Sequence, residues 1–238
     1  MNIGIDIDNV ISNFNEVLLS EYLIHDKELR EKGIINKNAE YIRKGMFDWS
    51  EIEEENFYKE NIERIARKLD LIEGAKEYIN KLHEDGNTIY IITGRDNGEY
   101  LEPYTMTKKW LDSHNIYYDN LILTNAYNKH EKSEKCIENN IDVIIDDSVS
   151  ICRDCINNGI TTLLMDTPYN KYEKSIPKVY NWKEIFEYII EYKKEKLNVI
   201  LDTDTYNFYF IYYSWFFFYS NSNIGNCPYC HNISFIIF

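Results

Sequence analysis

Short apolar runs alternate with longer amphipathic stretches along most of this 238-residue chain. The apolar runs predict five buried strands, over residues 2–7, 87–94, 120–125, 142–147 and 161–166. The amphipathic stretches predict helices over 105–115, 131–140, 150–159 and 181–196, the third ending at Gly159 in a left-handed cap. Apolar strands separated by helices are typical of a parallel sheet covered on both faces. The pattern therefore predicts an α/β fold.

Two segments depart from this alternation. Residues 14–85 are polar and charged and contain no convincing strand, so we expect a helical insert between the first and second strands. Residues 197–238 are dense in aromatic side chains, and the run "FYFIYYSWFFFY" (208–219) is too short to span a bilayer comfortably and lacks basic flanks. An added strand pair, an interfacial segment and a poorly ordered extension are all compatible with this tail.

Unusual polar residues follow four of the predicted strands at their carboxyl ends. They are Asp6 and Asp8, then Thr93, Gly94 and Arg95, then Lys129 and Lys132 in and after a loop, and finally Asp146 and Asp147. Ligands of open parallel sheets bind beyond the carboxyl ends of the strands. We therefore expect these side chains to converge on a single crevice.

A divalent cation would explain why acidic side chains gather at that crevice. Bare carboxylates this close repel one another, and burying one unpaired is costly. Mg²⁺ binds oxygen ligands, commonly one or two carboxylates together with waters and a substrate phosphate. Thr93 and neighbouring backbone N–H groups can hold phosphate oxygens, and a lysine adds positive charge. Such a site suits phosphoryl transfer.

Composition narrows the partners. The net charge is −14, from 40 acidic and 26 basic residues, and a surface this acidic repels a nucleic-acid backbone. A small phosphorylated ligand is not excluded, because a local cation can override the global field. The N-terminus shows no secretory signal, and the five cysteines are an odd number, which favours reduced thiols and a cytoplasmic setting.

The four motifs "DIDNV", "IITGR", a lysine at a helix start and "IIDDS" resemble those of the haloacid dehalogenase superfamily, over roughly residues 1–196. The resemblance implies a Rossmann-like catalytic core over 1–13 and 86–196, a small helical cap over 14–85 and an appended tail over 197–238. It also implies an Mg²⁺-dependent phosphatase that forms an aspartyl-phosphate.

The same resemblance implies a role for each motif residue. Asp6 is the expected nucleophile, and Asp8 is the expected general acid and base, whose backbone carbonyl also binds the metal. Thr93 is expected to hold the phosphoryl group. Asp147 is expected to complete the metal ligands, Asp6, Asp8 and Asp147, with Asp146 beside it outside the direct ligand set. Lys132 is the preferred active-site lysine, with Lys129 as the alternative and Lys135 a solvated residue.

A narrower resemblance concerns the stretches "LIEGAKEYINKLHEDGNTIYIITGRD" and "TKKWLDSHNIYYDNLIL", which are similar to bacterial nucleotidases related to the 5′(3′)-deoxyribonucleotidases. It implies a nucleoside monophosphate as substrate, contacted by Gly94 and Arg95 and stacked on cap aromatics, with Phe14, Phe47 and Trp49 as candidates. Packing within the cap is the competing role for Phe47 and Trp49.

Several alternatives stay open at the level of sequence. Arg95 can equally pair with a structural carboxylate. The same core suits a sugar phosphatase or a phosphomutase, and the tail could instead make the chain a partner-binding module. Of the two CxxC patterns, "CRDC" (152–155) suits one buried helix face better than zinc, whereas "CPYC" (227–230) with His231 resembles half of a zinc knuckle. The sequence does not indicate an oligomeric state.

Overall fold

The computed structural model describes residues 1–39 and 41–198. The chain divides into two compact units, Met1–Ile190 and Glu191–Phe238. In the second unit the described residues, 191–198, are helical. The expectations for the aromatic run 208–219 and for the CPYC pattern with His231 lie outside the described residues. The sheet, the helical insert and the candidate site all belong to the first unit.

The core of this unit is a six-stranded sheet in the order β3-β2-β1-β4-β5-β6, in which every paired neighbour is parallel. The strands are β1 (Asn2–Ile5), β2 (Thr88–Thr93), β3 (Asn120–Leu123), β4 (Val143–Asp146), β5 (Thr161–Met165) and β6 (Lys178–Val179). The five predicted strands are confirmed. The sixth was not predicted, because two residues at a sheet edge leave no apolar run to detect.

The first strand is shorter than predicted and ends at Ile5. Its centre needs a glycine, since a Cβ on Gly4 would lie 2.6 Å from Cδ1 of Ile144 on the neighbouring strand. After the strand the chain turns, and the carbonyl of Ile7 accepts hydrogen bonds from the N–H groups of Val10, Ile11 and Ser12. Asp8 therefore lies in the turn that follows the strand.

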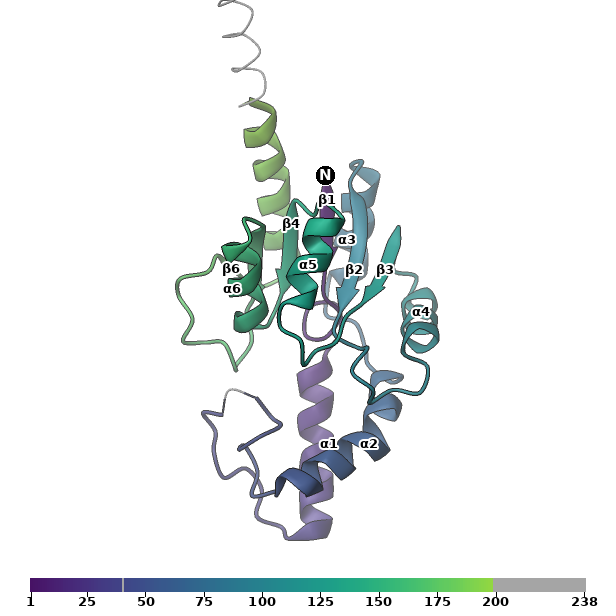
Figure 1. The fold of residues 1–238 in the computed structure, drawn as a ribbon, viewed down its shortest axis with the longest axis vertical. Helices are drawn as coiled ribbons and strands as arrows, with labels where there is room; N and C mark the ends of the chain where they lie inside the picture. Colours follow the sequence, from purple (N-terminus) through teal and green to yellow (C-terminus); the bar gives the residue numbers. More distant parts are fainter. Residues whose placement is uncertain (40, 199–238) are drawn as a thin grey trace, which may run out of the picture. The chain divides into compact units, whose positions relative to one another are not determined.

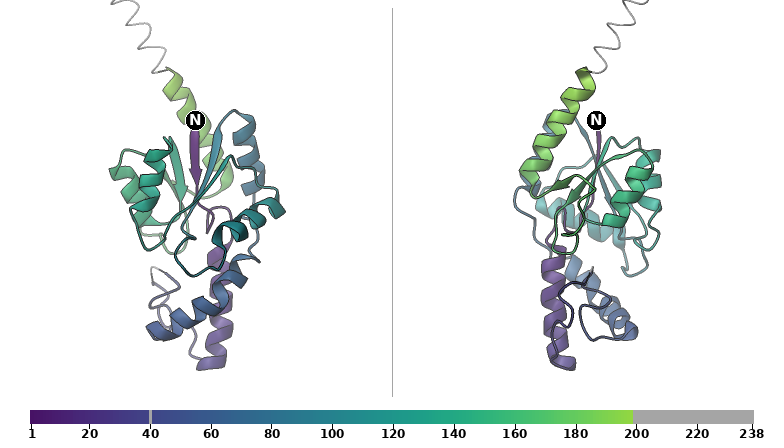
Figure 2. Two further views of the ribbon diagram at one scale, coloured as in Figure 1. Left: turned by 45° about the vertical axis from the view of Figure 1, so that its right-hand side comes forward. Right: turned by 90° about the vertical axis from the view of Figure 1, so that its left-hand side faces the viewer.

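Helices cover both faces of the sheet, as predicted (Figure 2). The helices of the core are α3 (Ala75–Glu84), α4 (Pro103–His114), α5 (Glu131–Glu138), α6 (Val149–Asn157) and the stretch 182–190. α6 packs over β4 and β5, and α5 packs beside it against β2. α3 also packs against β2, and its Tyr78 ring lies 5.5 Å from the ring of Phe186. α6 ends before Gly159, whose φ of +79° gives the predicted left-handed end.

The helical insert lies beyond the carboxyl ends of the strands, where the arrowheads point in Figure 1. It contains α1 (Phe14–Leu29) and α2 (Glu51–Ala66). A capping box starts α2: Ser50 accepts from the N–H of Glu53, and the Glu53 carboxylate accepts from the N–H of Ser50. Two amphipathic helices so placed can bury their apolar faces only against each other and against the core.

The two connections between the insert and the core lie side by side. Asn13 donates its N–H to the carbonyl of Asp70 at 3.1 Å, and Ile72 donates to the carbonyl of Ile11 at 2.8 Å. The side chain of Asn13 also accepts from the N–H of Asp70. We call residues 11–13 and 70–72 the paired linkers. They fix where the insert joins the core.

The position of α3 bears on the boundaries of the insert. The predicted cap ran to residue 85, but α3 buries Ala75, Ile79 and Leu82 and packs on strand β2. We therefore propose that the cap ends at the paired linkers and that α3 belongs to the catalytic core. Among residues 1–39 and 41–198, no helix combines the length and apolar character that a membrane crossing needs.

Candidate active site

A buried lysine joins two of the strand ends. Nζ of Lys132 donates to Oδ1 of Asp6 at 2.8 Å and to Oδ2 of Asp146 at 2.6 Å, and all three side chains are less than one-tenth exposed. Strand register produces this arrangement, because Ile5 pairs with Ile145 and the residue after each is an aspartate. Lys132 reaches them from the first turn of α5.

The charges at this point do not balance. Burial raises the pKa of Asp6 to about 6, with Asp146 and Asp8 adding to the rise against the opposing effect of Lys132. Burial, and then the charges of Asp146 and Asp6, raise the pKa of Asp147 well above its ordinary value. The single ammonium group of Lys132 therefore leaves the carboxylates of Asp6, Asp146 and Asp147, the acidic cluster, short of positive charge.

The turn after β1 carries Asp8 and Asn9, and hydrogen bonds hold both of their side chains. Arg95 is fully buried and donates from two guanidinium nitrogens to the carboxylate of Asp8, with Nε 3.2 Å from Oδ2. Asn9 adopts a φ of +65°, which asparagine tolerates. Its side-chain amide donates to Oδ2 of Asp147 at 2.8 Å and accepts from the N–H of Asn15 at 2.7 Å. Of the two roles left open for Arg95, the structure shows the ion pair with a carboxylate.

The end of β2 supplies the expected phosphate-binding groups. The hydroxyl oxygen Oγ1 of Thr93 is buried and has no hydrogen-bond partner among the described residues. A Cβ on Gly94 would lie 3.0 Å from Cβ of Ala126, so glycine lets the end of β2 approach the loop after β3 closely. An unpaired buried hydroxyl is costly, and an oxygen of a bound phosphate would satisfy it.

The acidic cluster, Lys132 and Gly94 form the floor of a cavity of about 460 Å³ between the sheet and the cap. Thr93 and Arg95 are not among the described residues that line it. That volume falls within the range of about 300–1,000 Å³ that is usual for small-molecule sites. The predicted residues on the cavity wall are Asp6, Asp8, Phe14, Gly94, Lys129, Lys132, Asp146 and Asp147. Lys129 is exposed on the wall, whereas Lys135 pairs with Glu138 at the surface.

The chain matches the family described as 5′ nucleotidase, deoxy (pyrimidine), cytosolic type C protein over residues 1–195. It belongs to this nucleotidase family. A nucleotidase of Clostridium acetobutylicum is 28% identical over 196 residues, which cover 78% of this chain and 92% of that protein. The motif residues that form the cavity floor all lie within the matched region.

Solved structures agree on the fold. A predicted phosphatase from Clostridium acetobutylicum superposes with a TM-score of 0.58 at 12% identity, over 80% of this chain and 98% of the other. A haloacid dehalogenase-like hydrolase from Streptococcus pneumoniae gives a TM-score of 0.55 at 16% identity, over 79% and 97%. The nucleotidase thus has the fold of the haloacid dehalogenase superfamily and is a phosphoric monoester hydrolase, as the motifs predicted.

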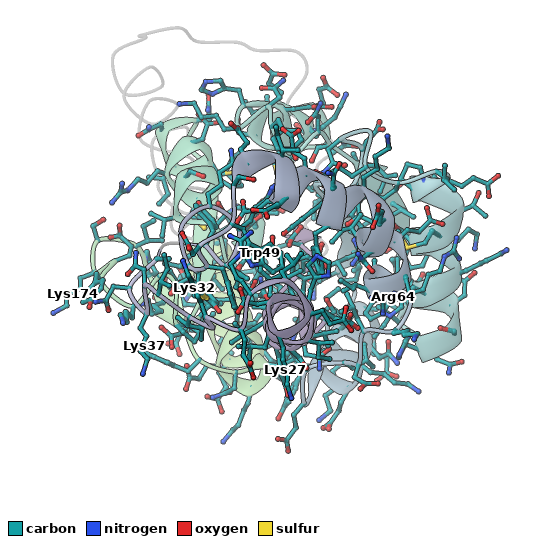
Figure 3. The ribbon with its side chains drawn as sticks, turned by 90° about the horizontal axis from the view of Figure 1, so that it is seen from below. Lys27, Lys32, Lys37, Trp49, Arg64 and Lys174 are labelled. Atoms are coloured by element: carbon teal, nitrogen blue, oxygen red, sulfur yellow. The ribbon has the colours of Figure 1, made fainter. Side chains whose placement is uncertain are left out.

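Two predicted substrate contacts of the nucleotidase do not lie at the cavity. Phe47 is buried in the cap. Trp49, which is labelled in Figure 3, stacks on Tyr22 at 4.4 Å and donates from Nε1 to Asp26 at 2.8 Å. Neither belongs to the described residues that line the cavity. The geometry therefore favours the competing role of Phe47 and Trp49, packing inside the cap, over base stacking. Phe14, the third candidate, does lie on the wall.

Sequence reasoning missed several groups on the cavity wall. Arg43 and Tyr58 come from the cap, Tyr127 comes from the loop after β3, and Asn9 holds Asp147. Asn9 lies inside the "DIDNV" motif and could have been found there. The other three lie outside every motif, and no local pattern marks them.

The residues on the floor fit a magnesium ion better than a closed metal centre. Among the described residues, no group of three or more His, Cys, Asp or Glu side chains could hold a metal by itself. Asp6 and Asp147 each retain one carboxylate oxygen that accepts no hydrogen bond from the described part of the chain. Mg²⁺ commonly takes only one or two carboxylates and completes its shell with water and phosphate. The shortage of positive charge in the acidic cluster also favours a bound magnesium ion.

The remaining cysteine prediction is confirmed. Cys152 and Cys155 are free thiols, and both lie on the buried face of α6. Their spacing of three residues therefore reflects packing of that helix.

Proposed function

We propose that this nucleotidase is an Mg²⁺-dependent phosphomonoesterase that hydrolyses nucleoside monophosphates through an aspartyl-phosphate. The observation that carries the proposal is the bridge from Lys132 to Asp6 and Asp146 at the cavity, next to the strand end that carries Gly94 and the unpaired hydroxyl of Thr93. A nucleophilic carboxylate, a cation and a phosphate-binding hydroxyl are thereby gathered at one point.

In the first step, an oxygen of Asp6 attacks phosphorus, and the bond between phosphorus and the ester oxygen breaks. Asp8 gives its proton to the departing oxygen, which leaves as an alcohol. Thr93 and the N–H groups beside Gly94 hold the phosphoryl oxygens. Lys132 holds the Asp6 carboxylate in its orientation through a hydrogen bond, and its positive charge offsets the negative charge that develops in the transition state.

In the second step, Asp8 takes a proton from water, and the water oxygen attacks the phosphorus of the aspartyl-phosphate. The acyl–phosphate bond breaks, which releases inorganic phosphate and restores the Asp6 carboxylate. Arg95 fixes the direction of the Asp8 carboxylate in both steps through its two hydrogen bonds. Asp8 can act only on an atom that lies along that direction.

Asp6, Asp147 and the backbone carbonyl of Asp8 are the groups that would hold Mg²⁺. When bound, the ion supplies positive charge that neutralises the acidic cluster and the substrate phosphate. Asn9 keeps Asp147 in place for this role through its amide. The unpaired carboxylate oxygens of Asp6 and Asp147 are the observation that supports it.

The choice of a nucleoside as leaving group rests on the family and on the wall of the cavity. The matched family is described as acting on pyrimidine deoxynucleotides, and the wall carries Phe14, Tyr58 and Tyr127. Aromatic rings of this kind can stack on a nucleobase.

A panel of ribo- and deoxyribonucleoside monophosphates, sugar phosphates and glycerol phosphate tests the proposal, with phosphate release measured at saturating Mg²⁺. We expect the highest kcat/KM on a nucleoside monophosphate, loss of activity in EDTA and its recovery on adding Mg²⁺. Asp6→Asn should reduce turnover to background. Preference for a sugar phosphate would replace the nucleotidase assignment with the sugar phosphatase alternative, and conversion of a phosphate ester to its isomer would indicate a mutase.

A further inference from the structure

The cap also contacts the core away from the paired linkers, through the side chain of Arg43. Its NH1 donates to Oε1 of Glu99 at 2.7 Å and to the hydroxyl of Tyr127 at 2.7 Å. Arg43 belongs to the cap, Glu99 to the loop after β2 and Tyr127 to the loop after β3. Arg43 and Tyr127 also line the cavity. We call these three residues the latch.

The ion pair within the latch is shielded from water. The side chains of Arg43 and Glu99 are 18% and 17% exposed, so their attraction is screened less than that of a surface pair. Glu99 raises the pKa of Arg43 against the opposing effect of burial, which keeps the guanidinium charged. A third bond closes the group, since the hydroxyl of Tyr127 donates to the same carboxylate.

Both ends of the latch are held before any substrate arrives. On the cap side, Glu54 accepts from the N–H of Lys44 with both oxygens at 2.9 Å, which fixes the chain next to Arg43. Tyr58 lies one turn after Glu54 on the same face of α2. The centre of its ring is 4.2 Å from the guanidinium carbon of Arg43. On the core side, Asn97 holds Glu99 through its side-chain amide at 3.1 Å.

We propose that Arg43, Glu99 and Tyr127 latch the cap closed around the leaving group, and that Arg43 thereby determines the selectivity for phosphate esters with large leaving groups. The claim rests on the proposed function. Outside the paired linkers, the N–H of Leu101 donates to Glu63 and Lys171 donates to Asn38. The latch adds an ion pair between cap and core in which both side chains are less than one-fifth exposed. A small leaving group occupies only the floor, so it gains little from a closed wall, whereas a nucleoside fills the space that Tyr58 and Tyr127 border.

Steady-state kinetics on a nucleoside monophosphate and on glycerol phosphate, with Mg²⁺ present, measure the effect. For Arg43→Gln we expect kcat/KM on the nucleotide to fall at least about tenfold, mainly through KM, and kcat/KM on glycerol phosphate to change less than about threefold. Arg43→Lys keeps a charged donor and should recover most of the loss. Arg43→Gln combined with Glu99→Gln should be no worse than the single change, because both remove one interaction.

Arg64→Gln is the matched control. Arg64 also pairs with a glutamate, Glu21, but both partners lie in cap helices and the pair does not reach the core. It should leave kcat/KM on both substrates within about twofold. An equal fall on both substrates in Arg43→Gln, or a similar fall in Arg64→Gln, would overturn the latch.

Amide hydrogen exchange tests the latch without substrate. In Arg43→Gln, the segments that carry Glu99 and Tyr127 should exchange faster than in the wild type, and in Arg64→Gln they should not. Unchanged exchange in Arg43→Gln contradicts the latch whatever the substrate is. If the wild type hydrolyses no nucleoside monophosphate, the proposed function fails, and the exchange result still decides for or against the latch.

Discussion

The buried guanidinium of Arg95 makes a two-pronged ion pair with the carboxylate of Asp8, which lies in the turn after the first strand. A lysine cannot reproduce this contact, because its ammonium group is a single point donor. Arg95 is therefore a positioning residue for Asp8 in the proposed mechanism, and the alternative of direct substrate contact predicts different kinetics.

Arg95→Lys should lower kcat by roughly 10- to 100-fold and leave KM within about threefold, because the acid and base group loses its direction. Steady-state kinetics on the preferred substrate measure both constants. Arg153→Lys is the control, since Arg153 pairs with Glu173 at the surface and should behave as the wild type. A raised KM with unchanged kcat would instead assign Arg95 to substrate binding.

Lys132→Met should lower kcat at least about 100-fold and also destabilise the fold. Removing one member of a buried ion pair typically costs about 3–5 kcal/mol, since the carboxylates of Asp6 and Asp146 lose their partner. Denaturant unfolding without Mg²⁺ measures the cost. Lys135→Met removes a surface lysine of the same helix and should change neither quantity. Full activity in Lys132→Met would pass the role to Lys129.

Asp6→Asn should stabilise the metal-free protein in a pH-dependent way. Burial raises the pKa of Asp6 from 3.8 to about 6, so the folded protein holds this proton more tightly than the unfolded chain. Its contribution to stability is therefore present at low pH and is lost as the pH rises from about 4 to about 6. The Tm of Asp6→Asn minus that of the wild type, measured in EDTA, should grow over that interval. A difference that stays constant with pH would contradict the shift.

Phe47 and Phe14 should respond in opposite ways to truncation. Phe47→Ala removes a buried cap ring and should cost about 3–5 kcal/mol of unfolding free energy, while the folded enzyme keeps its KM. Phe14→Ala changes a half-buried residue on the cavity wall and should raise KM for the nucleotide several-fold with a smaller loss of stability. A KM effect in Phe47→Ala alone would restore the original assignment.

The elements that could be predicted are those with a local signal. Each of the five apolar runs forms a strand, and each of the four polar strand ends reaches the same cavity, because parallel strands share one carboxyl edge. The preference for Lys132 over Lys129 came from the family resemblance, in which the lysine lies at the start of the helix after the third strand.

The elements that could not be predicted depend on contacts distant in sequence or on too few residues. Arg43 meets a tyrosine 84 positions later, and nothing in the local sequence marks either as a partner. Phe47 and Trp49 lie in the non-helical stretch before α2, where no periodicity tells whether a ring faces the cap interior or the cavity. The first strand was predicted to run to residue 7, because an apolar run does not reveal that the strand stops at Ile5.

The paired linkers have a consequence for how such enzymes diversify. Since residues 11–13 and 70–72 already hydrogen-bond to each other, the chain enters and leaves the cap at neighbouring points. A different insert, or a short hairpin, could be spliced between them without breaking the sheet register or moving the acids of the floor. The same reaction centre can therefore be combined with new substrates by exchanging one contiguous segment of the chain, the cap.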